Sequence, residues 1–325
     1  MRVSQDRIDT DFDSTSGELY LWASNSGRIL RGNWKTRQIG DWVTLDSTGC
    51  SSSLDVHIWE ISAMRSRPYL IVLNCYHIEV LDKTTLARVR IVDTPDQSKV
   101  FGFVLSPNEE QLVVTSQESR DNWTASVYDT TSWTALRKWS INNASFTADG
   151  QQVATLIDQR QDPSSRVFDE CGVAFYDVRT GEKVTQWVKS TNDPGHVCPG
   201  GNLYFRKDHP GRMVTDDFPN SAVSEWDMQT GALLQHLVSD VGAGGPPPGA
   251  DCMSLSYDGD LVAIVRTRHE VGTEYGFTIW NLQSGKVVYE IPLKYQDDPV
   301  RCVRFSSNGT HIAFVHSDRV EIYEY

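Results

Sequence analysis

Residues 251–259 read DCMSLSYDG and residues 301–309 read RCVRFSSNG, so the end of the chain contains one motif twice. An apolar strand pattern follows each glycine, DLVAIVRT from Asp260 and THIAFVHS from Thr310. Asp-Gly and Asn-Gly supply the positive φ angles that a two-residue hairpin turn requires. The repeated unit is therefore strand, tight turn, strand, and an internal repeat of this size decides the fold.

Two further strand patterns complete the unit. GFTIWNLQSG, which starts at Gly276, reads as a third strand closed by a polar turn, and KVVYEIP over residues 286–292 reads as a fourth. The run from Asp260 is mostly apolar on both faces, which is typical of a strand between two other layers. Four short antiparallel strands that recur every ~40–50 residues are typical of a propeller blade.

A third-strand motif recurs along most of the chain and ends in Asp, Asn or Glu. The residues that precede this polar residue are Leu81, Tyr128, Tyr176, Trp226, Trp280 and Tyr323, at intervals of 47, 48, 50, 54 and 43 residues. Trp226-Asp227 is a WD dipeptide, and Tyr-Asp and Trp-Asn are common variants of it. Over roughly residues 54–325 the chain therefore resembles a divergent WD40-type β-propeller, in the WD40, YVTN and quinoprotein-like group. No Gly-His dipeptide recurs from blade to blade, and the Asp–His–Ser–Trp network of that family is not traceable, which leaves the subfamily open.

We expect an all-β fold, a seven-bladed β-propeller of four-stranded antiparallel blades that forms one domain over residues 1–325. The expected blades cover roughly residues 1–50, 54–92, 100–140, 141–188, 196–238, 251–293 and 300–325. The last blade has only three strand patterns before Tyr325, so the N-terminal segment completes it or it stays open. An open blade would leave an unpaired strand edge.

The charge pattern bears on partners and location. The net charge is −13, and the acidic residues are scattered rather than clustered. Such a surface argues against nucleic acid as a partner, because binding phosphate requires a basic stripe. It would suit a partner with a basic surface, although an acidic balance also serves solubility alone. No apolar stretch approaches the ~20 residues of a membrane helix, so no membrane partner is expected.

The chain contains six cysteines, at positions 50, 75, 171, 198, 252 and 302, and none forms a CxxC pair. Several fall inside predicted strands, so we expect reduced, buried thiols. No signal peptide is visible in residues 1–13. Together these features predict a cytoplasmic or nuclear protein.

Motifs of catalysis and metal binding are absent from the sequence. It contains no GxSxG, GxxxxGK[ST], HExxH or GxGxxG pattern. Residues 9–18, DTDFDSTSGE, have acids at calcium-loop spacing, but Ser14 stands where such a loop requires glycine. Cys75 and His77 lie two apart on a predicted strand without a second pair, which favours packing over metal binding. We expect no catalytic residue, no metal and no cofactor.

The tryptophans divide into two groups. Five lie in predicted strands, where a large side chain fills space between blades: Trp59, Trp139, Trp187, Trp226 and Trp280. Three fall in predicted turns or loops and are candidates for a contact surface: Trp34, Trp123 and Trp133.

One position per blade is expected at the mouth of the central channel, where the innermost strand begins. Aligning the first strands on their closing Ser or Thr gives His57, Phe101, Asn142, Asp251 and Arg301. A ring of aromatic, amide, acidic and basic side chains would suit a peptide or protein side chain. The alternative is a solvated rim without a partner.

The favoured function is a non-catalytic interaction scaffold, as the WD40 resemblance implies, with a protein or peptide bound on a disk face near the channel. The chain would act as a monomeric propeller within a complex. Two alternatives stay open: a propeller-platform enzyme, either a quinoprotein-like oxidoreductase or a hydrolase, and a small-ligand sensor. The fold alone does not decide among them.

Overall fold

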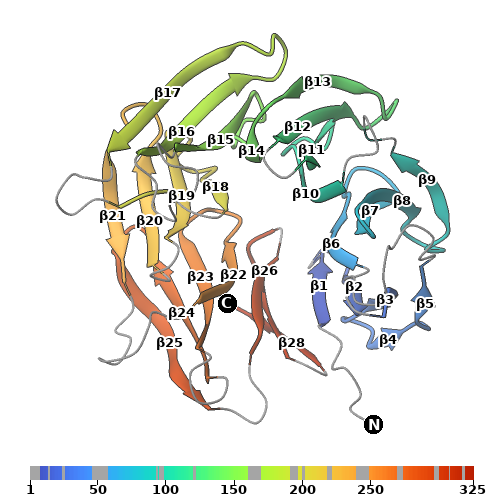
Figure 1. Ribbon diagram of the computed structural model, residues 1–325. Coiled ribbons are helices and arrows are strands. Elements are labelled where there is room, and N and C mark those ends of the chain that lie inside the picture. Colours follow the sequence, from blue (N-terminus) through green and yellow to red (C-terminus); the bar gives the residue numbers. More distant parts are fainter. Residues whose placement is uncertain are drawn as a thin grey trace.

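Seven antiparallel sheets follow one another along the chain around a central channel, so the computed structural model confirms an all-β, seven-bladed propeller (Figure 1). The structure describes residues 8–13, 15–23, 26–45, 58–92, 94, 99–119, 122–159, 170–190, 197–199, 202–217, 222–238, 249–268, 274–295, 300–306, 308–316 and 319–325. Within blades 2 to 7 the strands pair in chain order, whereas in blade 1 the fourth and fifth strands both pair with the third. The first strand of each blade is innermost.

Blade 1 is five-stranded and contains β1 (Ile8–Phe12), β2 (Glu18–Ala23), β3 (Arg28–Asn33), β4 (Gln38–Ile39) and β5 (Val43–Thr44). Blade 2 contains β6 (Ile58–Ala63), β7 (Tyr69–Asn74), β8 (His77–Asp82) and β9 (Arg88–Val92). Blade 3 contains β10 (Lys99–Leu105), β11 (Gln111–Ser119), β12 (Asn122–Asp129) and β13 (Ala135–Trp139). Blade 4 contains β14 (Asn142–Phe146), β15 (Gln152–Gln159), β16 (Glu170–Asp177) and β17 (Lys183–Ser190).

Blade 5 contains β18 (Leu203–Phe205), β19 (Arg212–Asp217), β20 (Ala222–Asp227) and β21 (Leu233–Leu237). Blade 6 contains β22 (Gly249–Leu255), β23 (Leu261–Arg268), β24 (Glu274–Asn281) and β25 (Lys286–Tyr295). Blade 7 is three-stranded and contains β26 (Cys302–Phe305), β27 (His311–Val315) and β28 (Val320–Glu324).

One backbone hydrogen bond recurs where each innermost strand ends. The residue after the strand, here called the closing residue, donates its N–H to a carbonyl across the turn. The closing residues and their acceptors are Asp13 and Glu18, Met64 and Tyr69, Ser106 and Gln111, Thr147 and Gln152, Arg206 and Arg212, Ser256 and Leu261, and Ser306 and His311. Positions counted back from the closing residue are therefore equivalent around the channel.

The polar residue that marks the third strand has a structural role in the next turn. In blades 1 to 6 its side-chain oxygen accepts the N–H of the residue three positions later, an Asx-type turn that fixes the chain reversal. These residues are Asn33, Asp82, Asp129, Asp177, Asp227 and Asn281. The residue four positions on has positive φ in every case: Arg37, Leu86, Trp133, Gly181, Gly231 and Gly285.

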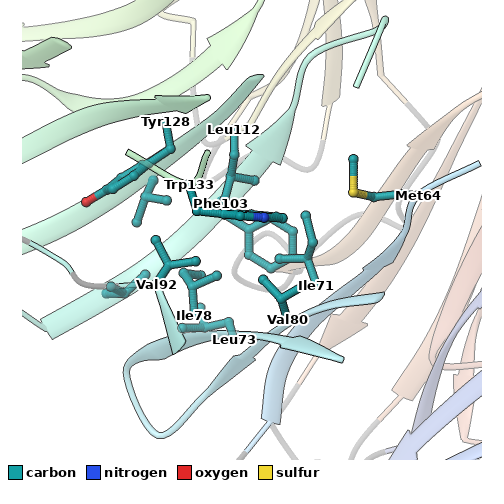
Figure 2. Packing of buried hydrophobic residues seen from close by; sticks show 12 residues of the cluster. Met64, Ile71, Leu73, Ile78, Val80, Val92, Phe103, Leu112, Tyr128 and Trp133 are labelled. Atoms are coloured by element: carbon teal, nitrogen blue, oxygen red, sulfur yellow. The ribbon is translucent and has the colours of Figure 1, made fainter. Parts of the chain in front are cut away.

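The hydrophobic core lies between neighbouring blades. The cluster between blades 2 and 3 contains Met64, Ile71, Leu112 and Trp133 (Figure 2). Trp133 is only 9% exposed, so its expected place in a contact surface is wrong. Among the tryptophans predicted to fill space between blades, three are buried: Trp187, Trp226 and Trp280.

The cysteines correct the expectation of reduced thiols. Cys171 is bonded to Cys198, Cys252 is bonded to Cys302, and Cys75 is also disulfide-bonded, so none of the described cysteines is a free thiol. Cys252 and Cys302 occupy the same position in successive innermost strands, which places their Cα atoms 5.3 Å apart. The repeat itself therefore brings the two sulfurs together.

The ring closes between blade 7 and blade 1 through side chains. Phe12 and Leu19 pack against Ala313, and Asn308 Nδ2 donates to Thr15 Oγ1 at 3.2 Å. Among the described residues no fourth strand pairs with β28. The described part of the chain also contains no helix long and apolar enough to span a membrane.

Candidate functional site

A cavity of about 910 Å³ occupies the central channel. Every innermost strand contributes to its wall, through residues that include Asp11, Glu60, Gly102, Ser145, Tyr204, Met253 and Arg304. The wall is therefore built from equivalent positions of seven strands, and its chemistry depends on which side chain each blade places there.

A β-bulge lies near the beginning of several innermost strands. The register skips Trp59 in β6, Phe101 in β10, Asn143 in β14 and Asp251 in β22. A bulge leaves one residue unpaired and changes the direction in which its side chain points. The bulge therefore determines, separately in each of these blades, how the side chain at the beginning of the innermost strand is directed at the mouth of the channel.

The five residues predicted at this mouth are placed as follows. Phe101 is a bulge residue, is 36% exposed and lines the cavity. Asp251 holds the bulge position of β22, and Asn142 is a paired residue next to the bulge, which falls on Asn143. Arg301 is half-buried and donates its N–H to the carbonyl of Val315.

His57 lies outside the described residues. The position in blade 2 that is five before the closing residue is Trp59, which also holds the bulge. The structure thus brings Phe101 to the cavity, and the binding role of all five residues stays a prediction.

A row of three aromatic rings lies at the mouth. The ring of Phe101 is 5.5 Å from that of Tyr76 and 5.0 Å from that of Trp123, centroid to centroid. Lys99 Nζ lies 4.8 Å from the Tyr76 ring. Trp123, expected in a loop as a contact residue, lies in β12 and lines the cavity with Phe101. Sequence reasoning missed Tyr76.

Tyr76 is held in this row by a strained turn. Cys75 and Tyr76 connect β7 to β8 with φ angles of 49° and 66°, which non-glycine residues rarely adopt. The carbonyl of Tyr76 accepts the N–H of Val100 at 3.1 Å, so the turn of blade 2 is bonded to the innermost strand of blade 3. Such strain persists only where the surrounding structure fixes it, and it concentrates at functional sites. The sequence feature that could have identified Tyr76 is this turn, because two residues that are not glycine separate two strand patterns there.

One step deeper than the aromatic row lies a carboxylate. Glu60 Oε2 accepts the backbone N–H of Phe103 at 3.3 Å, which places it beside β10. Glu60 and Gly102 hold the same position, four before the closing residue, in blades 2 and 3. A Cβ added to Gly102 would meet only Glu60 Oε2, at 3.9 Å. The missing side chain at Gly102 therefore leaves space beside this carboxylate.

The waist of the channel, two positions before the closing residue, carries further polar groups. Asp11 Oδ2 accepts the N–H of Ala63 at 2.7 Å. Burial raises the pKa of Asp11, opposed by hydrogen bonds and by the charges of Arg65 and Arg304. The hydroxyl of Tyr204 and the guanidinium of Arg304 donate to the same acceptor, the carbonyl of Met253, at 2.9 and 3.4 Å. Burial also raises the pKa of Tyr204.

The cavity wall contains aromatic and charged groups that can contact a ligand. Within the described ranges no group of three His, Cys, Asp or Glu side chains lies close enough together to hold a metal ion. The wall combines aromatic surface at the mouth with acidic and basic side chains, which are Asp11, Asp13, Glu18, Glu60 and Glu109 and Arg65, Lys83, Lys207 and Arg304. Such a surface can stack against an apolar or planar group and accept hydrogen bonds from a donor inserted past it.

No protein-family model and no curated protein matches the sequence. Among solved structures, the Cps50 (Swd1) β-propeller domain of Myceliophteria thermophila is similar, with a TM-score of 0.68 and 14% identity over 100% of this chain and 98% of that one. Kuenenia stuttgartiensis hydrazine synthase has a TM-score of 0.69 and 12% identity, covering 97% and 94%. KlHsv2 with loop 6CD replaced by a Gly-Ser linker has a TM-score of 0.63 and 11% identity, covering 98% and 93%. These likenesses show a shared β-propeller fold.

Proposed function

We propose that this chain is a non-catalytic interaction module that binds a peptide segment of a protein partner at the channel mouth. The observation that carries the proposal is the row of Tyr76, Phe101 and Trp123 at the opening of the cavity. Aromatic side chains are enriched at the centres of protein interfaces, where they bury a large area at low entropic cost. The row spans blades 2 and 3, so it is held by two sheets and is ready to bind without rearrangement.

The fold does not decide between a scaffold and an enzyme, because hydrazine synthase shares it with the Swd1 propeller. The proposal therefore depends on the site. An exposed aromatic ring directly over a deep cavity suits a side chain that projects from an extended peptide, with the rest of the peptide lying across the face of the disk. A partner that contributes such a segment would hold the propeller as one subunit of a complex.

The test is selection of peptides from a random display library on the intact protein. Selected peptides are then measured against Phe101→Ala and against Tyr257→Ala, a matched control in which an aromatic residue, 46% exposed, is removed from the β22–β23 turn. That turn lies at the opposite end of the innermost strand from the mouth. Phe101→Ala should weaken binding by about tenfold or more, a typical effect for an aromatic anchor.

Equal loss with Tyr257→Ala would place the binding surface on the other face. Retention of full affinity by Phe101→Ala would remove the mouth as the site. Circular dichroism of both variants shows whether the propeller is intact.

A further inference from the structure

We propose that the row of Tyr76, Phe101 and Trp123 binds a proline-rich segment of the partner in the polyproline II conformation. This inference rests on the proposed function and specifies which kind of peptide the mouth recognises. Three features of the described residues support it: the arrangement of the rings, an indole N–H that has no partner among them, and a lysine that already covers one ring.

The rings form a short row with inclined faces. Phe101 lies 5.5 Å from Tyr76 and 5.0 Å from Trp123, and its plane is tilted by 56° against each of them. Among the described residues Tyr76 and Trp123 make no ring contact with each other, so Phe101 stands between them. Proline-rich segments bind to surfaces lined by aromatic rings, because their apolar rings pack there and their backbone is already extended.

The length of the row suits one turn of such a segment. Polyproline II repeats every three residues and rises ~3.1 Å per residue, so prolines three positions apart lie on the same side, ~9 Å from each other. The two steps from ring to ring, 5.5 and 5.0 Å, together reach a comparable distance. One proline would therefore pack near Tyr76 and Phe101, and the other near Trp123.

The indole of Trp123 supplies a hydrogen-bond donor. Its ring is half-buried and lines the cavity. Its Nε1 has no hydrogen-bond partner among the described residues, and it is not one of the buried polar atoms that lack a partner, so it is open to an acceptor. Proline has no N–H, and polyproline II leaves its backbone carbonyls unbonded, so such a segment presents acceptors and few donors. An indole N–H is a donor only and therefore matches this segment.

The charges around the row favour a neutral ligand. Lys99 Nζ lies 4.8 Å from the centroid of the Tyr76 ring, so the protein itself supplies the cation that this aromatic face attracts. The cavity wall carries basic side chains, such as Arg65, as well as acidic ones, such as Asp11. A segment that binds through apolar rings and carbonyl groups needs no net attraction from either sign. It also loses little conformational entropy, because proline restricts the free peptide.

The test uses two peptide libraries displayed on phage and selected on the intact protein. One library has prolines fixed three positions apart among random residues, and the matched library has alanines at these two positions. We expect binders that depend on Phe101 from the proline library and none from the alanine library. Replacing either proline of a selected peptide by alanine should weaken its binding about tenfold.

Trp123→Phe separates the hydrogen bond from the ring. It keeps an aromatic side chain in the row and removes the Nε1 donor, so it should weaken the selected peptides about three- to tenfold, as the loss of one hydrogen bond does. The matched control is Trp139→Phe on the outer strand β13, where Nε1 donates to the carbonyl of Gly181 at 3.0 Å. It also removes an indole donor, but away from the row, and should leave the affinity unchanged.

Three results would overturn the inference and leave the proposed function standing. They are binders of equal affinity that depend on Phe101 from the alanine library, an unchanged affinity in Trp123→Phe, and an equal loss in both tryptophan variants. Peptides that bind independently of Phe101 would overturn both the inference and the proposed function. Circular dichroism of each variant shows whether the propeller is intact, and the comparison of the two libraries needs no variant that could fail to fold.

Discussion

The rings of Trp34 and His311 lie 4.9 Å apart, centroid to centroid, and join blade 1 to blade 7 across the seam of the propeller. His311 begins β27, and Trp34 follows directly after β3. Among the described residues, the cluster at this seam has three buried hydrophobic residues, fewer than any other cluster between the blades. This ring contact therefore adds to the buried contacts that close the circle.

Replacing Trp34 by alanine should open the seam. We expect a loss of about 2–3 kcal/mol in the free energy of unfolding, somewhat below the range for a fully buried Trp, because Trp34 is half-buried. Equilibrium denaturation measures the change. The control is Trp34→Phe, which keeps a ring and removes the indole Nε1, a buried atom with no hydrogen-bond partner among the described residues. Trp34→Phe should lower the free energy of unfolding much less than Trp34→Ala. An equal loss in both variants would show that packing of the ring at the seam is not the reason for the destabilisation.

Arg37 offers a stabilising substitution. It stands four residues after Asn33 with a φ of 57°, at the position that Gly181, Gly231 and Gly285 occupy in other blades. Since glycine reaches this region without steric cost, Arg37→Gly should raise the free energy of unfolding by about 0.5–1 kcal/mol, after its larger loss of chain entropy.

The reverse change is the control for this prediction. Gly231→Ala places a Cβ in the same conformation and within 2.4 Å of the Trp187 ring, so it should destabilise the protein. A neutral or destabilising Arg37→Gly would show that strain at this turn has been overestimated.

The aspartates of the Asx-type turns predict a dependence of stability on pH. Hydrogen bonds from the residue three positions later hold the pKa values of Asp82, Asp129, Asp177 and Asp227 below the ordinary 3.8. A carboxylate with a lower pKa in the folded state stabilises it fully above the unfolded pKa. That contribution is lost as the pH falls through the folded value. Stability should therefore decline as the pH falls below about 4.

The control combines Asp→Asn at these four positions, since Asn281 already performs the same role in blade 6. Denaturation curves of this variant should have a flatter acid limb than the wild type. Asp11 has the opposite sign, because burial raises its pKa and its charged form opposes folding. A variant with an acid limb as steep as the wild type would assign the pH dependence to other groups.

The disulfide between Cys252 and Cys302 closes a loop of 50 residues between blades 6 and 7. Its removal by Cys252→Ser with Cys302→Ser should cost about 4 kcal/mol, as the loop-closure relation gives for this length. Thermal denaturation with and without reductant provides the measurement. Alkylation without reductant, followed by mass spectrometry, should leave both cysteines unlabelled. Full labelling of both cysteines in protein isolated from its native cells would contradict the disulfide. It would instead support the expectation of reduced thiols in a cytoplasmic or nuclear protein.

The fold was predictable because its signals are local. Each hairpin carries its own turn and strand pattern, and the interval between Tyr128, Tyr176 and Trp226 reflects the size of one blade. The site depends on contacts between blades. Phe101 could be placed near the channel by counting from Ser106, whereas Tyr76 reaches it only through a turn bonded to the next blade.

The cysteines show the same limit. A separation of 50 residues reveals nothing about proximity until Cys252 and Cys302 are assigned to the same position of neighbouring blades. The N–H of Phe103 meets Glu60 for the same reason, because innermost strands far apart in sequence stand side by side around the channel. The Asx turn at Asn33 also escaped the sequence pattern, since Gly32 stands where other blades have an aromatic residue or leucine.

Blade 7 has three described strands, and no described strand of blade 1 is paired with it to close the propeller ring. Six of its junctions join blades that are consecutive in the chain, and among the described residues the seventh joins the two ends through side-chain contacts. Native-state hydrogen exchange should therefore begin at β28 and β1 before any other strands. A peptide bound in the channel would contact several blades at once. It would therefore hold the blades together and slow the hydrogen exchange of strands that it does not contact.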